Sequence, residues 1–224
     1  MRRSNGEEMM LYRFGRAICR TFFKIFCRME VMGADIPRSG GCLLVANHVS
    51  YLDPPLVGAA ISRSIYFMAK QELFEIPVMG SIIAGTGAFP VKRGTADRGA
   101  LKRARALLHD GNVVCIFPEG RRSLDGTLQS AEAGAALVAA QSNVPVVPLG
   151  LIGTAAVLPP GGVILHPHPV KAIIGEPLYL DDLRAEKYDR LLLNEIGHRM
   201  MDGIAEAIRQ GLDTNGEVTE EGRP

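Results

Sequence analysis

The stretch CLLVANHVSYLDPP at residues 42–55 sets the pattern for the whole chain. Its first five residues are apolar and predict a strand, which empties into a polar loop. Asp53 with two prolines behind it predicts the start of a helix, because Asp is a favoured N-cap and Pro suits the first helical turn. Strand, loop and helix in this order are typical of an α/β unit.

The rest of the chain repeats this alternation. Strand-like apolar runs lie at 43–46, 65–69, 88–91, 113–117, 144–151 and 170–174. Helix-like stretches lie at 54–60, 76–84, 97–109, 131–141 and about 188–210. We therefore predict an α/β fold with a largely parallel or mixed sheet flanked by helices.

Length and composition narrow the functional classes. The 224 residues, 47% hydrophobic and 22% charged, suit one domain with a small appendage. A net charge of +1 gives no reason to expect binding to nucleic acid. The four cysteines form no C-x-x-C pair and no metal-ligand spacing with the histidines, so we expect a reduced, cytosol-facing protein without disulfides, metal or cofactor. We also expect neither a secretory signal nor a transmembrane helix.

Residues 9–30 predict an amphipathic helix, in which the cations fall on one arc about 120° wide and apolar side chains on the opposite arc. The cations are Arg13, Arg16, Arg20, Lys24 and Arg28, and the apolar side chains are Leu11, Phe14, Ile18, Phe22, Ile25, Phe26 and Met29. This pattern fits a helix lying on an anionic membrane surface, and a helix packed on its own domain is the alternative. We accordingly divide the chain into a membrane-associating segment (1–32), an α/β domain (33–212) and a polar tail (213–224) that is predicted to be disordered.

His48 and Asp53 are the first candidate catalytic residues. A neutral imidazole can take a proton near pH 7 because its reference pKa is about 6.5. A carboxylate beside it holds the useful tautomer and stabilises the imidazolium that forms. The spacing does not suit one straight helical face, so the pairing requires the turn that Asp53 and its prolines offer. The alternative is that Asp53 only caps a helix and His48 is an ordinary loop histidine.

Three further blocks follow in order: GAFPVKR (87–93), FPEGRRS (117–123) and VPVVPLG (144–150). Together with the loop at 47–53, they resemble the glycerolipid acyltransferases, specifically the 1-acylglycerol-3-phosphate (lysophosphatidate) acyltransferase family. The likeness runs from about Gly33 to Gly175. Each block alone is a weak pattern, whereas four in register are a specific one.

The resemblance implies a role for each candidate residue. His48 removes the proton from the acceptor hydroxyl, Asp53 orients His48, and the alkoxide attacks an acyl thioester with no acyl-enzyme. The glycerol phosphate is held by Arg93 and by the turn Glu119, Gly120, Arg121 and Arg122. We expect Lys70 to add positive charge nearby, because ligands gather at the carboxyl ends of strands in an open α/β sheet. For the turn and for Arg93, a surface ion pair and a solvated strand end are the alternatives.

Two positions depart from the family pattern. The family commonly has Thr or another small residue where this chain has Arg121. It also commonly has a Phe-Lys pair in the following segment, where this chain has Ala131 and Glu132. We expect Arg121 to compensate for the missing lysine by helping to hold the acceptor phosphate, and a solvent-facing Arg121 is the alternative.

The resemblance thus implies a peripheral enzyme of phospholipid biosynthesis on the cytoplasmic face of the cell membrane. It would transfer a fatty acyl group from acyl-CoA or acyl carrier protein to the sn-2 hydroxyl of lysophosphatidate, giving phosphatidate. Another lysolipid or glycerol 3-phosphate as acceptor, or a non-enzymatic anionic-lipid-binding protein, are the alternatives. A serine or metal hydrolase is disfavoured because the sequence shows no nucleophile elbow and too few metal ligands.

Overall fold

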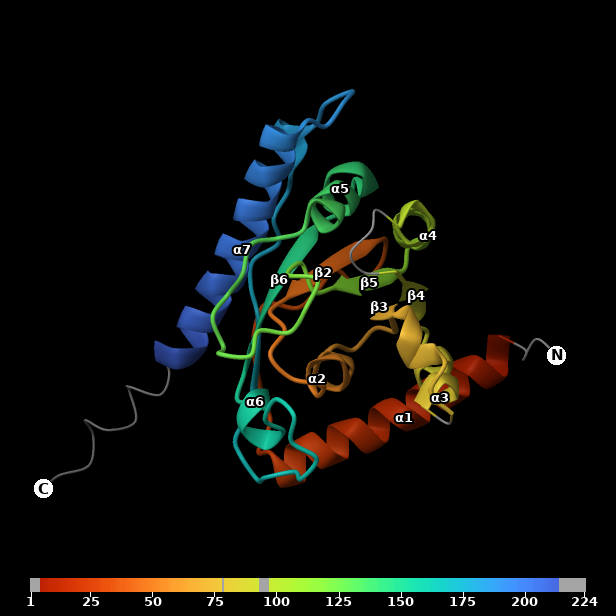
Figure 1. Cartoon of the computed structure of the whole chain (residues 1–224), viewed down its shortest axis with the longest axis vertical. Coiled ribbons are helices and arrows are strands. Elements are labelled where there is room, and N and C mark those ends of the chain that lie inside the picture. Colours follow the sequence, from red (N-terminus) through yellow and green to blue (C-terminus); the bar gives the residue numbers. More distant parts are fainter. Residues whose placement is uncertain (1–4, 78, 93–96, 214–224) are drawn as a thin grey trace, which may run out of the picture.

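The structure, a computed structural model, describes residues 5–77, 79–92 and 97–213 (Figure 1). In this part of the chain one mixed sheet is made of β1 (Glu30–Gly33), β2 (Cys42–Ala46), β3 (Ile65–Lys70), β4 (Phe89–Val91), β5 (Val113–Ile116), β6 (Val146–Ile152) and β7 (Lys171–Ile174). The strand order is β1-β7-β6-β2-β5-β3-β4. Strands β2 to β6 run parallel, whereas β7 pairs antiparallel with β6, and β1 parallel with β7. The predicted fold class is confirmed.

Helices cover both faces of the sheet (Figure 1). They are α1 (Asn5–Phe26), α2 (Asp53–Ala60), α3 (Met79–Gly85), α4 (Arg98–His109), α5 (Ala133–Ser142), α6 (Thr154–Val157) and α7 (Arg190–Asp213), with short 3-10 turns at Gln71–Phe74 and Asp181–Leu183. Successive side chains of a strand point to opposite faces, so Leu44 of β2 packs with α1 and α2, and Leu43 packs with α4, α5 and α7. This double burial explains why β2 reads as a continuous apolar run.

Each predicted strand is present, with small shifts at its ends. Strand β1 was not predicted, because Glu30–Gly33 is a short edge strand with three of its four residues exposed. The predicted boundary between residues 32 and 33 falls inside this strand. The four-residue helix α6 was also missed, since it is too short to show a helical period. The predicted tail lies outside the described residues apart from Asp213, the last residue of α7.

Helix α1 divides each of its two predicted arcs between the protein and the solvent. Arg16 donates a hydrogen bond to the carbonyl oxygen of Ser62 (2.9 Å), and Arg20 donates one to that of Ala59 (3.0 Å). A guanidinium is favourable at Ala59, because the last carbonyls of α2 lack helical partners and carry the negative end of its dipole. Part of the basic arc therefore packs against the protein.

Part of the apolar arc, Phe22, Phe26 and Met29, packs against the core, and an apolar stripe of α1 faces outward. It consists of Met10, Phe14, Ile18 and Ile25, of which Phe14 is 65% and Ile25 78% exposed. We call these four residues the α1 stripe. The helix is anchored on its other side by Phe23, which is buried in the core with α2. Among the residues that the structure describes, none of the helices combines the length and the apolar character needed to cross a membrane.

Candidate active site

The candidate site lies where β2, β5 and β6 end. These strands are parallel neighbours, so their carboxyl ends share one edge of the sheet. Asn47 follows β2 and bridges to β6: its Nδ2 donates to the carbonyl oxygen of Leu151 (2.9 Å), and the amide of Leu151 donates to its Oδ1 (2.7 Å). The side chain thus continues the β2–β6 pairing and fixes where the loop leaves the sheet.

The His48 side chain is held on two sides. Its Nδ1 lies 2.8 Å from Oδ2 of Asp53, and its ring stacks on Phe117 with centroids 4.2 Å apart. Because an ionised carboxylate only accepts hydrogen bonds, this pairing places the imidazole proton on Nδ1. Nε2 then carries the lone pair that can receive a proton from a substrate. His48 is only 6% exposed, so little freedom of the ring remains to be lost on binding.

Asp53 is fully buried and accepts hydrogen bonds at both carboxylate oxygens. Oδ2 accepts the backbone N–H groups of Val49 and Ser50, each at 2.7 Å, besides His48. Oδ1 accepts the hydroxyl of Thr154 at 2.6 Å. The interpretation of Asp53 as an N-cap is wrong: α2 begins at Asp53, Leu52 occupies the N-cap position, and no side chain caps the helix. The carboxylate turns back onto its own loop because that loop offers three donors.

Thr154 belongs to the site, but the sequence did not predict it. It is the first residue of α6, is fully buried and lies 101 residues from Asp53 along the chain. Its short, charge-assisted hydrogen bond fixes the rotation of the carboxylate that His48 contacts. A lone Thr after an apolar strand carries no distinguishing pattern, so nothing in the sequence marked it.

The turn at 117–123 is bonded to both backbone groups of His48. Oε1 of Glu119 accepts the His48 amide (2.9 Å), and the Ser123 amide donates to the His48 carbonyl (2.7 Å). Oε2 of Glu119 accepts the amide of Gln129 (3.3 Å). Burial raises the pKa of Glu119, and the two backbone hydrogen bonds oppose that rise. Gly120 has φ 66°, in the left-handed region that favours glycine, so the turn can close here.

The two arginines of the turn point to different surroundings. The Arg122 guanidinium lies 3.6 Å from the ring centroid of Tyr51, which belongs to the His48 loop. Arg121 donates from Nε to Oε1 of Gln129 (2.6 Å) and lines a cavity of about 490 Å³ that also contains carboxylates of Glu119, Asp125 and Glu132. Arg122 therefore contacts the loop that carries His48 through a cation–π interaction, whereas Arg121 lies in a cavity lined by carboxylates.

Lys70 and Arg93 are the remaining predicted cations. Lys70 is the last residue of β3, and its Nζ lies 3.1 Å from Oε1 of Glu72. Arg93 lies outside the described residues. Within the described ranges, no group of three or more His, Cys, Asp or Glu side chains is placed to hold a metal ion.

The hydroxyls of the His48 loop and of the adjacent turn donate hydrogen bonds, and the thiols of β2 and β5 are neutral. The Ser50 hydroxyl donates to the carbonyl of Leu158 (3.1 Å), and that of Ser123 donates to Asp125 (2.9 Å). Burial raises the pKa of the Cys42 thiol to about 12, and it raises that of Cys115 as well. A neutral thiol is a poor nucleophile. Among the described residues, the arrangement therefore offers a base without an adjacent protein nucleophile.

Comparisons with known proteins agree with this chemistry. A family model described as acyltransferase matches residues 28–152, more than half of the chain and the whole His48 loop. A 1-acyl-sn-glycerol-3-phosphate acyltransferase of Bacillus subtilis is 31% identical over 149 residues, which cover 66% of this chain and 72% of that protein. The chain belongs to the lysophosphatidate acyltransferase family. The predicted resemblance is confirmed.

Other members of the family show how far the likeness extends. A chloroplastic 1-acyl-sn-glycerol-3-phosphate acyltransferase of Brassica napus is 37% identical over 159 residues, 69% of this chain and 46% of that protein. This chain thus spans less than half the length of that relative. The crystal structure of the 1-acyl-sn-glycerophosphate acyltransferase of Thermotoga maritima matches with a TM-score of 0.69 at 25% identity, covering 92% of this chain and 84% of that one. The likeness includes the fold as well as the blocks.

Proposed function

We propose that the protein transfers a fatty acyl group from an acyl thioester to the sn-2 hydroxyl of lysophosphatidate, giving phosphatidate and a free thiol. The observation that carries the proposal is the His48 imidazole, held through Nδ1 by the buried Asp53 at the carboxyl end of β2. Membership of the family supports the same reaction. Binding of a lipid alone requires no such base, which disfavours a non-enzymatic role.

The proposed reaction is a single displacement at the thioester carbonyl. Nε2 of His48 takes the proton of the acceptor hydroxyl while the oxygen attacks the carbonyl carbon. The C–S bond then breaks, and the imidazolium returns the proton to the departing sulfur. Asp53 stabilises the imidazolium meanwhile. A positioned base accelerates the reaction roughly 10²- to 10⁴-fold, and the orientation of two bound substrates accelerates it further.

Phosphate recognition is assigned to the cations that the sequence predicts for the site. We propose that Arg122 makes the main contact, because it is stacked on Tyr51 beside His48. A guanidinium fits phosphate with two parallel hydrogen bonds. Arg121, Arg93 and Lys70 add weaker attraction. Glu119 acts indirectly, by holding the His48 amide and shaping the turn.

The membrane is the proposed source of the acceptor. We propose that the protein is peripheral, on the cytoplasmic face, with the α1 stripe inserted at the boundary between headgroups and acyl chains. Four exposed apolar side chains on one helix face support this, since burying each removes apolar area from water. Arg13 and Lys24, which are exposed on the same helix, suit an anionic surface.

Purified protein tests the proposal directly. Acyl-CoA or acyl carrier protein thioester is offered with a panel of lysophosphatidate, other lysolipids and glycerol 3-phosphate, and the acylated product is identified by mass. We expect lysophosphatidate to give the highest kcat/KM. If another lysolipid or glycerol 3-phosphate gave the highest kcat/KM, that molecule would be the acceptor in place of lysophosphatidate. If no acceptor were acylated, the proposed acyl transfer would be wrong.

A further inference from the structure

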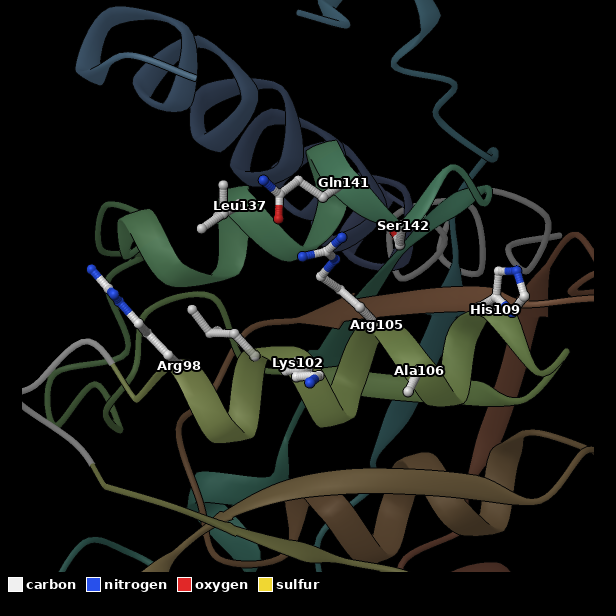
Figure 2. A pocket seen from close by; sticks show the side chains of 9 residues that line it. Arg98, Lys102, Arg105, Ala106, His109, Leu137, Gln141 and Ser142 are labelled. Carbon is white, nitrogen blue, oxygen red and sulfur yellow. The ribbon is translucent and has the colours of Figure 1, made fainter. Parts of the chain in front are cut away.

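A groove between α4 and α5 lies outside the site described above (Figure 2). It encloses a cavity of about 580 Å³. Arg98, Lys102, Arg105 and His109 line it from α4, and Leu137 and Gln141 line it from α5. Arg105 extends from α4 toward Gln141 across the groove (Figure 2). Leu101, Ala106 and Leu137 give the groove an apolar component beneath its basic rim.

The basic side chains form a stripe along one face of α4. Their separations of four, three and four residues place them on neighbouring turns, over a length of about 16 Å. Within the described part of the chain, Arg98, Lys102 and Arg105 form no ion pair with a carboxylate. The acidic residues at the ends of the helix are occupied: Asp97 accepts the Ala100 amide as N-cap, and Asp110 lies 3.7 Å from His109. Helix α5 contains no acidic residue.

This arrangement weakens the helix that carries it. Like charges four residues apart repel, and a cation in the first turn opposes the helix dipole. Asp97 at the N-cap offsets part of the dipole effect, but Arg98 and Lys102 form no ion pair with a carboxylate of the described residues. An acidic partner would relieve the remaining repulsion between the cations, so the stripe suits a partner outside the chain.

The groove faces away from the surface proposed to meet the membrane. Helix α1 packs in the cluster on one face of the sheet, whereas α4 and α5 pack in the cluster on the other face (Figure 1). With the α1 stripe on a bilayer, the groove points toward the aqueous phase. This favours a soluble acidic partner over anionic lipid.

One end of the groove lies toward the edge of the sheet that carries the candidate active site. Helices α4 and α5 both begin at the edge of the sheet where β2 and β5 end, and Leu101 of α4 lies in van der Waals contact range of a Cβ at Gly134 of α5. The chain entering α5 is tied to the active-site turn, because the Glu132 amide donates to the carbonyl of Pro118 (2.8 Å). A partner seated along the groove would thus lie beside the edge where its acyl chain is needed.

We propose that this groove docks an acidic helix of acyl carrier protein, which delivers the acyl thioester. This proposal rests on the proposed function and specifies the acyl donor of that reaction. Cations spread over three helical turns match an extended acidic surface, whereas the phosphates of a small donor such as coenzyme A call for cations that converge on a point. The apolar component gives a partner helix area to bury.

Charge reversal with two donors tests the proposal. Arg105→Glu places a repulsive charge in the groove, and Arg103→Glu makes the same charge change on the same helix at an exposed position that does not line the groove. We expect Arg105→Glu to lower kcat/KM for the carrier-protein thioester by about tenfold or more, the scale of one lost interfacial charge pair. Arg103→Glu should lower it far less, and neither variant should change kcat/KM for acyl-CoA. Thermal unfolding of both variants checks that the fold is intact.

Each other outcome overturns the inference. Equal losses with both donors would make the groove a coenzyme A site or a structural element. If Arg105→Glu and Arg103→Glu lowered kcat/KM equally, the cause would be the change in net charge rather than the groove. Loss of flotation on anionic vesicles without a donor effect would assign the groove to lipid. If wild-type protein uses acyl-CoA and not the carrier protein, this inference fails while the proposed function stands, and transfer from neither donor defeats the proposed function itself.

Discussion

Thr154→Val isolates the hydroxyl that holds Asp53. Valine has nearly the same shape as threonine, so the substitution removes the donor to Oδ1 without opening a cavity. The carboxylate keeps its three contacts on Oδ2, from His48, Val49 and Ser50. It loses the only contact on Oδ1 that the described residues provide, so it can rotate about the remaining oxygen.

The magnitude follows from burial. Asp53 and Thr154 are both fully buried, so water cannot replace the lost donor, and a hydrogen bond to a charged group contributes about 1.5–3 kcal/mol net. We expect Thr154→Val to lower the free energy of unfolding by this amount. If about half of that loss is felt in the transition state, where Asp53 stabilises the imidazolium, kcat falls by about three- to tenfold. The acceptor KM should stay unchanged, because Thr154 contacts Asp53 rather than the substrate.

Thr154→Ser is the matched control. Serine keeps the hydroxyl and deletes one buried methyl group, which costs about 1 kcal/mol of stability. We therefore expect Thr154→Ser to be destabilised while its kcat stays close to wild type. Denaturant unfolding and initial rates at saturating donor measure both quantities. If Thr154→Val turns over at the wild-type rate, or if Thr154→Ser loses as much kcat as Thr154→Val, the hydroxyl does not position the dyad.

Three further predictions follow from the same geometry. Arg122→Ala should raise the acceptor KM by about tenfold at saturating donor, and Arg121→Thr should raise it less; the reverse order would return phosphate recognition to Arg121. Because burial raises the pKa of Glu119, its carboxyl favours folding most at low pH, and this contribution falls as pH rises through the folded-state pKa. Glu119→Gln should consequently flatten the pH dependence of the unfolding free energy across the acidic range, and an unaltered slope would contradict the pKa shift. Replacing Ile18 and Ile25 together by Glu should abolish flotation on anionic vesicles without unfolding the protein, since both are exposed; undiminished flotation would leave α1 with a structural role alone.

The sequence predicts those parts of the site that are local in the chain. The His48–Asp53 pair lies within one short loop after a strand, so both the spacing and the required turn are visible in a few letters. The alternation of apolar runs likewise predicts the sheet, because burial on both faces makes each central strand continuous.

Features that depend on orientation or on distant contacts are not predictable in this way. The hydrogen bond from Thr154 joins residues 101 positions apart, and its existence depends on how β6 and α6 cross the loop. The helical period finds the two arcs of α1 but not which side chains of each arc face the protein, which depends on contacts such as those of Arg16 and Arg20 with distant carbonyl oxygens. Arg121 and Arg122 are adjacent letters, yet the turn sends their side chains to different surroundings.

The central claim is that His48 is the base of a direct acyl transfer and that Asp53 works only through it. The most direct test is the rate of lysophosphatidate acylation by His48→Ala, by Asp53→Asn and by the double variant, at saturating substrates and with folding checked by circular dichroism. We expect His48→Ala to lose about 10²- to 10⁴-fold in kcat, and the double variant to be no slower than the slower single variant. Retention of more than about a tenth of the wild-type rate by a folded His48→Ala protein would contradict this claim.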